Sequence, residues 1–421
     1  MAFFILLLYI ICIYLRPAEW IPAIYGWQLL DILAIVTIFL WIFAGTGSRI
    51  RFVKVPQNIF MLGFLGALVV SHLSHFYFYG ALSAFIDFSK TVIMFFLIVN
   101  LVNSTKKFKI TISLLIILTL ILAIQGIIQH RTGFGLAGQP LTKDGRITWI
   151  GIFNNPNDLA LALVMIVPFL LNSIFGSSPA RYKIICLPIL GILLYAIYLT
   201  NSRGGMVALS AVVFFYFLFR LIRKRYPIFG IIIGIILVAL LFTHGPSRMG
   251  MLSPEEESAY GRLDAWYEGI QMLKSAPLFG VGYNMFMNYH FRVAHNSIVH
   301  CAAETGLIGL FFWVGLFYFS FKGLLNIQKL KDHSPNAKSI KFYALALKIS
   351  IIGFLSSAFF SSRPYIALPY ILIALSVALF NTTQRIWGGL ENNFTLVDLR
   401  NISLLCLGSL GLIWGITKVY L

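Results

Sequence analysis

Charged residues are scarce in this chain of 421 residues. Only 11% are charged and 59% are hydrophobic, whereas about a quarter of an ordinary soluble domain is charged. Apolar runs such as 110–128 and 228–242 are long enough to cross a hydrocarbon core of about 30 Å as helices. The sequence therefore predicts an all-α, polytopic integral membrane protein without a soluble domain.

Cysteine and acidic residues are also few. Cys12, Cys186, Cys301 and Cys406 all lie in apolar runs without a CxxC pair, which argues against a disulfide framework or a cysteine metal site. Basic residues outnumber acidic ones by 32 to 14. They form short clusters between the apolar runs, so we expect them to set membrane topology and expect no nucleic-acid partner.

Roughly 12 to 13 transmembrane helices are predicted, and together they make residues 1–421 a single transmembrane domain. The predicted spans are 2–15, 27–45, 58–77, 82–102, 110–128, 157–175, 184–200, 205–221, 227–243, 295–320, 342–360, 365–381 and 401–420. Basic clusters fall on alternate loops, the largest being the loop 322–341. By the positive-inside rule this loop and the N-terminus are cytoplasmic.

The opposite, outer face carries two long loops, 129–156 and 244–294. Several arginines lie on this face against the orienting rule, which indicates either solvated loop charge or an anion-binding role. In the second loop, Ser253, Pro254 and Glu256 are typical of a helix start. Apolar residues recur at helical spacing from Tyr260 to Leu273, which predicts a short amphipathic helix along the outer membrane surface.

His295 lies where the second long loop enters a span. Helical geometry places Ala302, Gly306 and Gly309 on the same face, which predicts a groove of small residues open to a helix or a lipid-borne ligand. The same geometry points Glu304 the opposite way, so it is not expected to pair with His295. Tight helix packing around an interfacial histidine is the alternative interpretation.

Arg203 lies in the outer turn 200–205, which is so short that its flanking helices must form a hairpin. A guanidinium held at the membrane boundary suits paired contacts with phosphate, and the adjacent glycines would leave backbone amides open to an anion. Snorkelling toward lipid headgroups is the alternative.

A third polar cluster spans residues 149–158, where the first outer loop returns to the membrane. Asn154 and Asn157 offer amide groups, and Trp149 and Phe153 offer faces for sugar rings or an interface belt. The same residues equally predict a helix start with Asn155 as its cap.

These motifs together resemble the superfamily of O-antigen ligases and O-antigen polymerases. One pattern is similar to a motif associated with O-antigen ligases: His295-Asn296 is followed after nine residues by Gly306 and, after two more, by Gly309. Three further blocks resemble that superfamily and follow in its order: Phe153 to Asn157, Asn201 to Gly205, and Arg262 to Trp266 with Pro277 to Gly282. Leu310 stands where the ligase motif has threonine, so ligase and polymerase both stay open.

The resemblance implies a fold of the glycosyltransferase C type and a metal-independent membrane glycosyltransferase without a cofactor. It places the active site on the periplasmic face of a bacterial inner membrane, which makes 129–156 and 244–294 periplasmic loops. The donor would be a glycan on undecaprenyl diphosphate. The acceptor would be a sugar hydroxyl of lipid A-core or of a growing glycan, and membrane lipid would surround the chain.

The candidate catalytic residues are His295 as general base and Arg203 and Arg262 as diphosphate binders. Candidate substrate-binding residues are Arg146, Asn154, Asn157, Asn296 and Trp266. A polysaccharide or lipid transporter is an alternative of another class, and a non-catalytic scaffold is a third. A transporter is expected to show internal repeats and broken helices, and neither is evident in the sequence.

Overall fold

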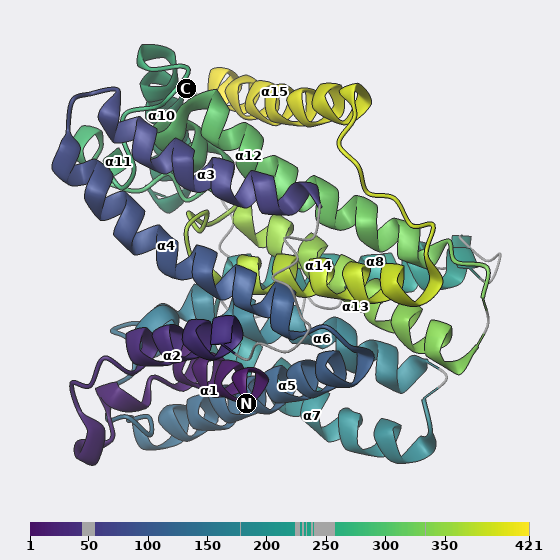
Figure 1. Cartoon of the computed structure of the whole chain (residues 1–421). Coiled ribbons are helices and arrows are strands. Elements are labelled where there is room, and N and C mark those ends of the chain that lie inside the picture. The colour runs from purple at the N-terminus through teal and green to yellow at the C-terminus, as the bar shows by residue number, and fades with distance from the viewer. Residues whose placement is uncertain are drawn as a thin grey trace. The chain divides into compact units, whose positions relative to one another are not determined.

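The computed structural model describes residues 1–43, 55–176, 178–223, 257–332 and 334–420, together with individual residues between 228 and 239. The regular structure of this described part is helical (Figure 1) and contains no β-strand, only an isolated bridge between Phe134 and Pro140. Two compact units divide the chain: unit 1 comprises Met1–Ile50, Leu97–Met251 and Leu330–Ser357, and unit 2 comprises Arg51–Phe96, Leu252–Lys329 and Ala358–Leu421.

Each unit is built from long helices and short connections. Unit 1 contains α1 (Ala2–Leu15), α2 (Leu29–Phe43), α5 (Thr105–Thr132), α6 (Pro156–Phe175), α7 (Ala180–Leu199), α8 (Arg203–Arg223) and nearly all of α13 (Pro335–Ala358). Unit 2 contains most of α4 (Phe78–Leu101), and α3 (Pro56–Leu73), α10 (Glu257–Ser275), α11 (Phe286–Tyr289), α12 (Ser297–Gln328), α14 (Ala367–Trp387) and α15 (Leu396–Tyr420).

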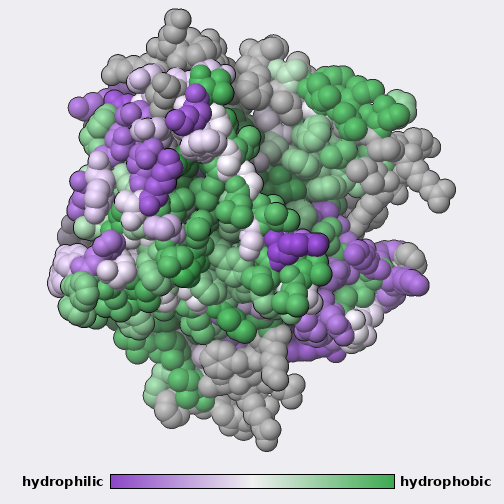
Figure 2. All heavy atoms as spheres, turned by 90° about the horizontal axis from the view of Figure 1, so that it is seen from above, coloured by the Kyte–Doolittle hydropathy of each residue, from purple (hydrophilic) through white to green (hydrophobic). Residues whose placement is uncertain are grey.

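The predicted polytopic, all-helical architecture is confirmed. Among the described residues, 10 helices are long and apolar enough to cross a membrane. The predicted spans 2–15 and 27–45 are helices of 14 and 15 residues, which is short of the roughly 20 residues that a perpendicular crossing needs. The predicted span 227–243 lies for the most part outside the described residues. Hydrophobic side chains cover much of the face seen in Figure 2, as on a surface that contacts lipid.

Helix α6 forms the centre of unit 1 and packs against α5, α7 and α8. Asn155 caps its N-terminus by accepting a hydrogen bond from the Asn157 backbone N–H at 2.8 Å, so the predicted cap is confirmed. Trp149 is buried and donates to the Tyr14 carbonyl at 3.0 Å, and the buried Phe153 ring packs on the Tyr14 ring. Both aromatic rings therefore hold the first outer loop against α1 and do not form an open sugar-binding surface.

Helix α12 forms the centre of unit 2 and packs against α3, α10, α14 and α15 (Figure 1). It is broken at Gly306, whose backbone has φ 66° and ψ −169°. The Leu307 N–H, freed by the break, donates to the Pro277 carbonyl at 2.9 Å. On the other side of the break, the Gly282 N–H donates to the Glu304 carbonyl at 3.0 Å.

This break corrects two expectations from the sequence. A close approach does occur at Gly306, where the chain's own segment 277–282 lies against α12, whereas a Cβ at Gly309 would meet Thr305 of α12 itself. A Cβ at Gly306 would lie 2.2 Å from the Leu278 carbonyl oxygen, so glycine is required there. The expectation of unbroken helices was also wrong, because hydrophobicity alone does not reveal a glycine with positive φ.

Helix α10 confirms the predicted helix of the second outer loop, although the predicted start at residues 253–256 lies outside the described residues. Its buried face is centred on Trp266, Gly269 and Ile270, whereas Tyr260 is 57% exposed. A Cβ at Gly269 would lie 2.4 Å from the Val299 side chain. The glycine therefore lets α10 pack directly on α12. As a result, the buried face of α10 differs from the face that the hydrophobic spacing predicted.

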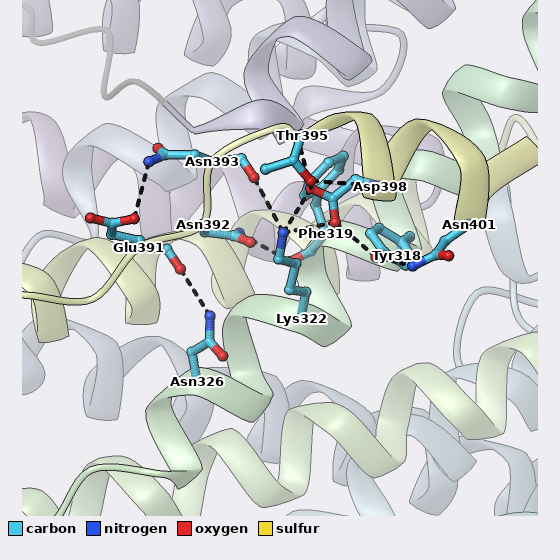
Figure 3. Close-up of polar contacts among 10 residues, drawn as sticks. All are labelled: Tyr318, Phe319, Lys322, Asn326, Glu391, Asn392, Asn393, Thr395, Asp398 and Asn401. Carbon is cyan, nitrogen blue, oxygen red and sulfur yellow. Dashed lines mark hydrogen bonds and ion pairs between the residues drawn. The ribbon is translucent and has the colours of Figure 1, made fainter.

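Helix α15 is fastened to α12 by a buried carboxylate (Figure 3). Asp398 accepts hydrogen bonds from Lys322 Nζ at 2.7 and 2.8 Å and from the Tyr318 hydroxyl at 2.8 Å. Thr395 donates to the same carboxylate through its backbone N–H and its hydroxyl. Because the charge of Asp398 is paired and fully hydrogen-bonded, its burial is tolerated.

Charged side chains inside the spans have different surroundings in the two units. Asp87 and Lys90, one helical turn apart on α4, are both exposed, and Ser83 donates to Asp87 at 3.3 Å. The buried Lys348 of α13 lies 3.7 Å from the centroid of the Phe219 ring. This cation–π contact stabilises a lysine in the interior of unit 1.

Candidate functional site

His295 lies immediately before α12, in a left-handed backbone conformation with φ 49°. The next residue, Asn296, is the N-cap of α12, and its side-chain oxygen accepts hydrogen bonds from the backbone N–H groups of Ile298 and Val299. The Asn296 Nδ2 atom is buried and has no hydrogen-bond partner in the described part of the chain. The cap places His295 at the positive end of a long helix, where an anion is favoured.

Three arginines surround the His295 imidazole. Burial, followed by the positive charges of Arg262, Arg363 and Arg292, lowers the pKa of His295 from 6.5 to about 4. Burial disfavours the charged imidazolium, and neighbouring cations disfavour it further. The imidazole is therefore neutral at pH 7 and able to accept a proton, while the surrounding positive charge favours an anionic ligand.

Arg363 is held beside the start of α12 by the turn that follows α13. The Arg363 backbone N–H donates to the Ser297 hydroxyl at 2.9 Å. The Ser297 hydroxyl in turn donates to the Ser361 carbonyl at 2.6 Å. This buried serine therefore fixes the turn 361–363 to the first residue of α12.

Arg292 and Arg262 are linked through a buried histidine. His290 Nε2 lies 3.0 Å from an Asp264 carboxylate oxygen, and His290 Nδ1 lies 2.8 Å from the Arg292 carbonyl oxygen and 3.2 Å from the Arg292 backbone nitrogen. Asp264 lies on α10, two residues after Arg262. The His290–Asp264 pair thus connects the segment that carries Arg292 to the helix that carries Arg262.

Trp266 lies in the packed interior of unit 2. Its ring meets the Phe359 ring edge-on, with the centroids 5.5 Å apart, within an apolar cluster that includes Ile270 and Phe286. The indole Nε1 is buried and has no hydrogen-bond partner among the described residues. Any contact of Trp266 with a substrate would therefore use this N–H group and not the ring face.

In unit 1, Arg146 and Asn157 form one hydrogen-bond network with the turn 200–203. Arg146 donates to the Thr200 carbonyl at 2.7 Å and to the Asn157 side-chain oxygen at 2.9 Å. The Ser202 hydroxyl donates to the same Asn157 oxygen at 2.7 Å. These bonds fasten the first outer loop and the start of α6 to the turn that precedes Arg203.

Arg203 is the first residue of α8 and is half-buried. The predicted short turn is confirmed, since α7 ends at Leu199 and α8 begins at Arg203, but the two helices pack mainly on α6 and not on each other. The glycines next to Arg203 were expected to leave their backbone N–H groups open to an anion. This expectation is wrong for Gly205, whose N–H donates to the Ser202 hydroxyl at 3.0 Å. A Cβ at Gly205 would lie 2.6 Å from the Ala160 Cβ, so this glycine serves the close packing of α8 on α6.

The predicted site residues thus form two clusters, one within each unit. Unit 1 brings together Arg146, Asn157 and the turn before Arg203, with Asn154 exposed at the end of a short 3₁₀ helix. Unit 2 brings together Arg262 and His295, with Asn296 as the cap beside them.

Sequence reasoning missed four residues around His295. Arg292 and Arg363 had a usable signal, because both lie in segments predicted to be on the outer face, where the positive-inside rule disfavours arginine. His300 and Glu304 are buried, and His300 Nε2 lies 3.2 Å from a Glu304 carboxylate oxygen. Their signal was the spacing of four residues inside an apolar span, where ionisable groups are rare.

The positive charge of the site in unit 2 comes from arginine side chains and a helix terminus. In the described part of the chain, no group of three or more His, Cys, Asp and Glu side chains is placed to hold a metal ion. The N–H groups of Ile298 and Val299 are already bonded to the Asn296 side chain, so the described site offers an anion its guanidinium groups and the positive end of the α12 dipole.

Comparison with known proteins agrees with the resemblance seen in the sequence. Residues 188–314 match a family model described as O-antigen ligase, and this range includes Arg203, Arg262 and His295. The chain is also 23% identical, over 223 residues, to the exopolysaccharide production protein ExoQ of Rhizobium meliloti (strain 1021). That alignment covers 46% of the chain and 51% of ExoQ, so the chain spans about half the length of this curated relative. The predicted resemblance to the O-antigen ligase and polymerase superfamily is confirmed.

Proposed function

From its likeness to the O-antigen ligase family, we propose that this multi-pass membrane protein is a metal-independent glycosyltransferase. It transfers a glycan from undecaprenyl diphosphate to an acceptor sugar hydroxyl at the periplasmic face of a bacterial inner membrane. The observation that carries this proposal is a neutral His295 at the N-terminus of α12, surrounded by Arg262, Arg292 and Arg363.

The reaction releases a proton and a negatively charged diphosphate, and the residues around His295 are suited to accept the proton and to stabilise the diphosphate. The oxygen of the acceptor hydroxyl forms a bond to the anomeric carbon of the donor glycan, and its proton moves to His295. The bond between the anomeric carbon and the diphosphate breaks, and the diphosphate leaves with the electron pair. Arginines and the positive end of the α12 dipole stabilise the negative charge that develops on this leaving group.

The residues of unit 1 have separate roles in this proposal. Arg203 binds phosphate through the paired donors of its guanidinium. Arg146 and Asn157 act mainly by holding the turn that places Arg203, because these hydrogen bonds join parts of the protein to one another. The exposed Asn154 amide is available to a sugar hydroxyl.

Polymerisation is a second candidate function, with a growing glycan as the acceptor. The likeness to an exopolysaccharide production protein favours it, and so does Leu310 in place of the threonine of the ligase motif. Transport is less well supported. A broken helix in a transporter typically coordinates substrate or ions, whereas the break in α12 is occupied by segment 277–282.

The test uses membranes from the native host with this gene deleted, which retain the host's lipid-linked glycan. Adding the purified full-length protein should consume that glycan and release undecaprenyl diphosphate. A product on lipid A-core identifies a ligase, and a ladder of longer glycans identifies a polymerase. If the lipid-linked glycan stays intact while folded protein is present, the proposed function is wrong.

A further inference from the structure

His295 and His300 occupy neighbouring positions at the start of α12. With Asn296 as the N-cap, His295 is the residue before the cap and His300 is the fourth residue after it. Hydrophobic side chains at these two positions often pack against each other at helix N-termini, and His295 and His300 are close enough to interact electrostatically. The backbone N–H of His300 donates to the Asn296 carbonyl at 2.9 Å. The first turn of α12 is therefore formed, and it sets the spacing between the two histidines.

Glu304 lies one helical turn beyond His300, on the side away from His295. One of its carboxylate oxygens lies 3.2 Å from His300 Nε2, and the other accepts the Phe286 backbone N–H at 3.0 Å. An ionised carboxylate repels the lone pair of a ring nitrogen, so Nε2 of His300, which faces it at 3.2 Å, carries the hydrogen. Nδ1 of a neutral His300 then carries the lone pair, as in a carboxylate–histidine pair that serves as a base.

The His300 ring is held in place, and its Nδ1 atom has no use within the described fold. The ring stacks on Phe286 with centroids 5.3 Å apart and meets Tyr365 edge-on at 5.7 Å. Nδ1 is buried without a hydrogen-bond partner among the described residues. Since a buried acceptor without a partner is costly, its retention requires an explanation.

We propose that His300 and Glu304 form a proton relay behind His295; this inference rests on the proposed function. His295 takes the proton of the acceptor hydroxyl on one ring nitrogen. The proton on its other ring nitrogen then passes to Nδ1 of His300, directly or through one water molecule. After the glycosidic bond has formed, His300 gives this proton to solvent or to the leaving diphosphate. His295 is left as its other neutral tautomer, and a flip of its ring or proton exchange with solvent restores the starting one.

The charges of the described residues give this transfer its direction. An imidazolium at His295 is opposed by Arg262, Arg292 and Arg363. An imidazolium at His300 faces the Glu304 carboxylate instead. A proton taken up at His295 is therefore stabilised by moving to His300.

The test compares Glu304→Gln and His300→Ala with the parent protein. Glu304→Gln keeps an oxygen for the Phe286 N–H but removes the charge, and His300→Ala removes the relay imidazole. His72→Ala is the matched control, because it removes a buried imidazole of α3 in the same unit. Undecaprenyl diphosphate is the binding probe, and transfer is measured with lipid-linked glycan in membranes of the deletion host, per folded molecule.

Both relay variants should bind undecaprenyl diphosphate as the parent does and should transfer glycan about a hundredfold more slowly, the lower end of the range for lost proton transfer. Added imidazole should restore part of the turnover of His300→Ala, since it can replace the missing base. It should not restore Glu304→Gln, in which the ring is still present. His72→Ala should transfer glycan at the parent rate per folded molecule.

Three outcomes would overturn the relay. Parent-like turnover in both variants would remove it from the mechanism and leave the proposed function standing. Parallel losses of probe binding and turnover, without rescue by imidazole, would show that the pair only packs the fold. Absence of transfer by the parent itself would refute the proposed function and the relay together.

Discussion

The protonation of His295 is decided by burial and by three guanidinium groups. Because these lower its pKa to about 4, His295 is neutral above that pH and becomes protonated only as the pH falls through it. Transfer should therefore persist well below pH 6.5, the ordinary histidine value. In Arg363→Gln a cation is lost, so the pKa should rise and the acid loss of activity should begin at higher pH. Transfer rates across pH, corrected for folded protein, check this; equal acid midpoints would contradict it.

Arg203 tests whether guanidinium geometry or charge alone matters. Arg203→Lys keeps the charge but replaces a planar group with paired donors by a compact ammonium. Loss of such a transition-state donor costs roughly 3 kcal/mol, or about a hundredfold in rate. The measurement is turnover per folded molecule, with Arg203→Gln as the comparison. A lysine variant with near-parent turnover would show that paired contacts are not needed.

Single residues also show how far the sequence could be interpreted. The Asn155 cap was predictable because its pattern is local, and the structure confirms it. The arginines around His295 come from α10, the loop before α12 and the turn after α13, so only tertiary folding brings them together. From the sequence we asked only whether Glu304 faces His295, and treated both residues as parts of one regular helix. In the structure the Glu304 carboxylate contacts the His300 ring instead.

At the scale of elements, the broken helix α12 organises unit 2. Hydropathy predicted the span but not its interruption, because the break depends on segment 277–282, which supplies hydrogen-bond partners on both sides of Gly306. The hydrophobic spacing of α10 predicted a helix correctly and its buried face incorrectly. The small residue Gly269 determines which side can approach α12.

Gly306→Ala should destabilise this element. The residue has φ 66°, and the added Cβ would lie 2.2 Å from the Leu278 carbonyl oxygen. Left-handed strain alone costs about 1–3 kcal/mol, and the clash adds to it. The melting temperature of the purified protein should fall, whereas Gly411→Ala on α15, where the added Cβ meets nothing within 4 Å, should keep or slightly raise it because alanine favours a helix interior. Equal melting temperatures for both variants would contradict this role of Gly306.

For the whole molecule, the number and order of the spans were largely predictable because long apolar helices are a strong local signal. The division into two units was not predictable. Residues 330–357 join unit 1 through α13, although both neighbouring segments belong to unit 2. Contacts such as the bond from Asn172 to the Phe342 carbonyl set this grouping, and hydropathy carries no information about them.

The predicted topology places residue 143 outside and residue 338 inside. Lys143→Cys and Lys338→Cys, each in a protein whose four native cysteines are replaced, test this with an impermeant thiol reagent on intact, outer-membrane-permeabilised cells. Lys143→Cys should react at once and Lys338→Cys only after lysis. Labelling of Lys338→Cys in unlysed cells would invert the scheme and place His295 on the cytoplasmic side.

The most direct test of the account is the transfer rate of His295→Ala per folded molecule that binds undecaprenyl diphosphate. If His295 accepts the proton of the acceptor hydroxyl, this rate should fall by about a hundredfold to ten-thousandfold while probe binding is kept. If His295 only packs the start of α12, the yield of folded protein falls and the surviving molecules transfer glycan normally. A rate within a few-fold of the parent would contradict the central claim.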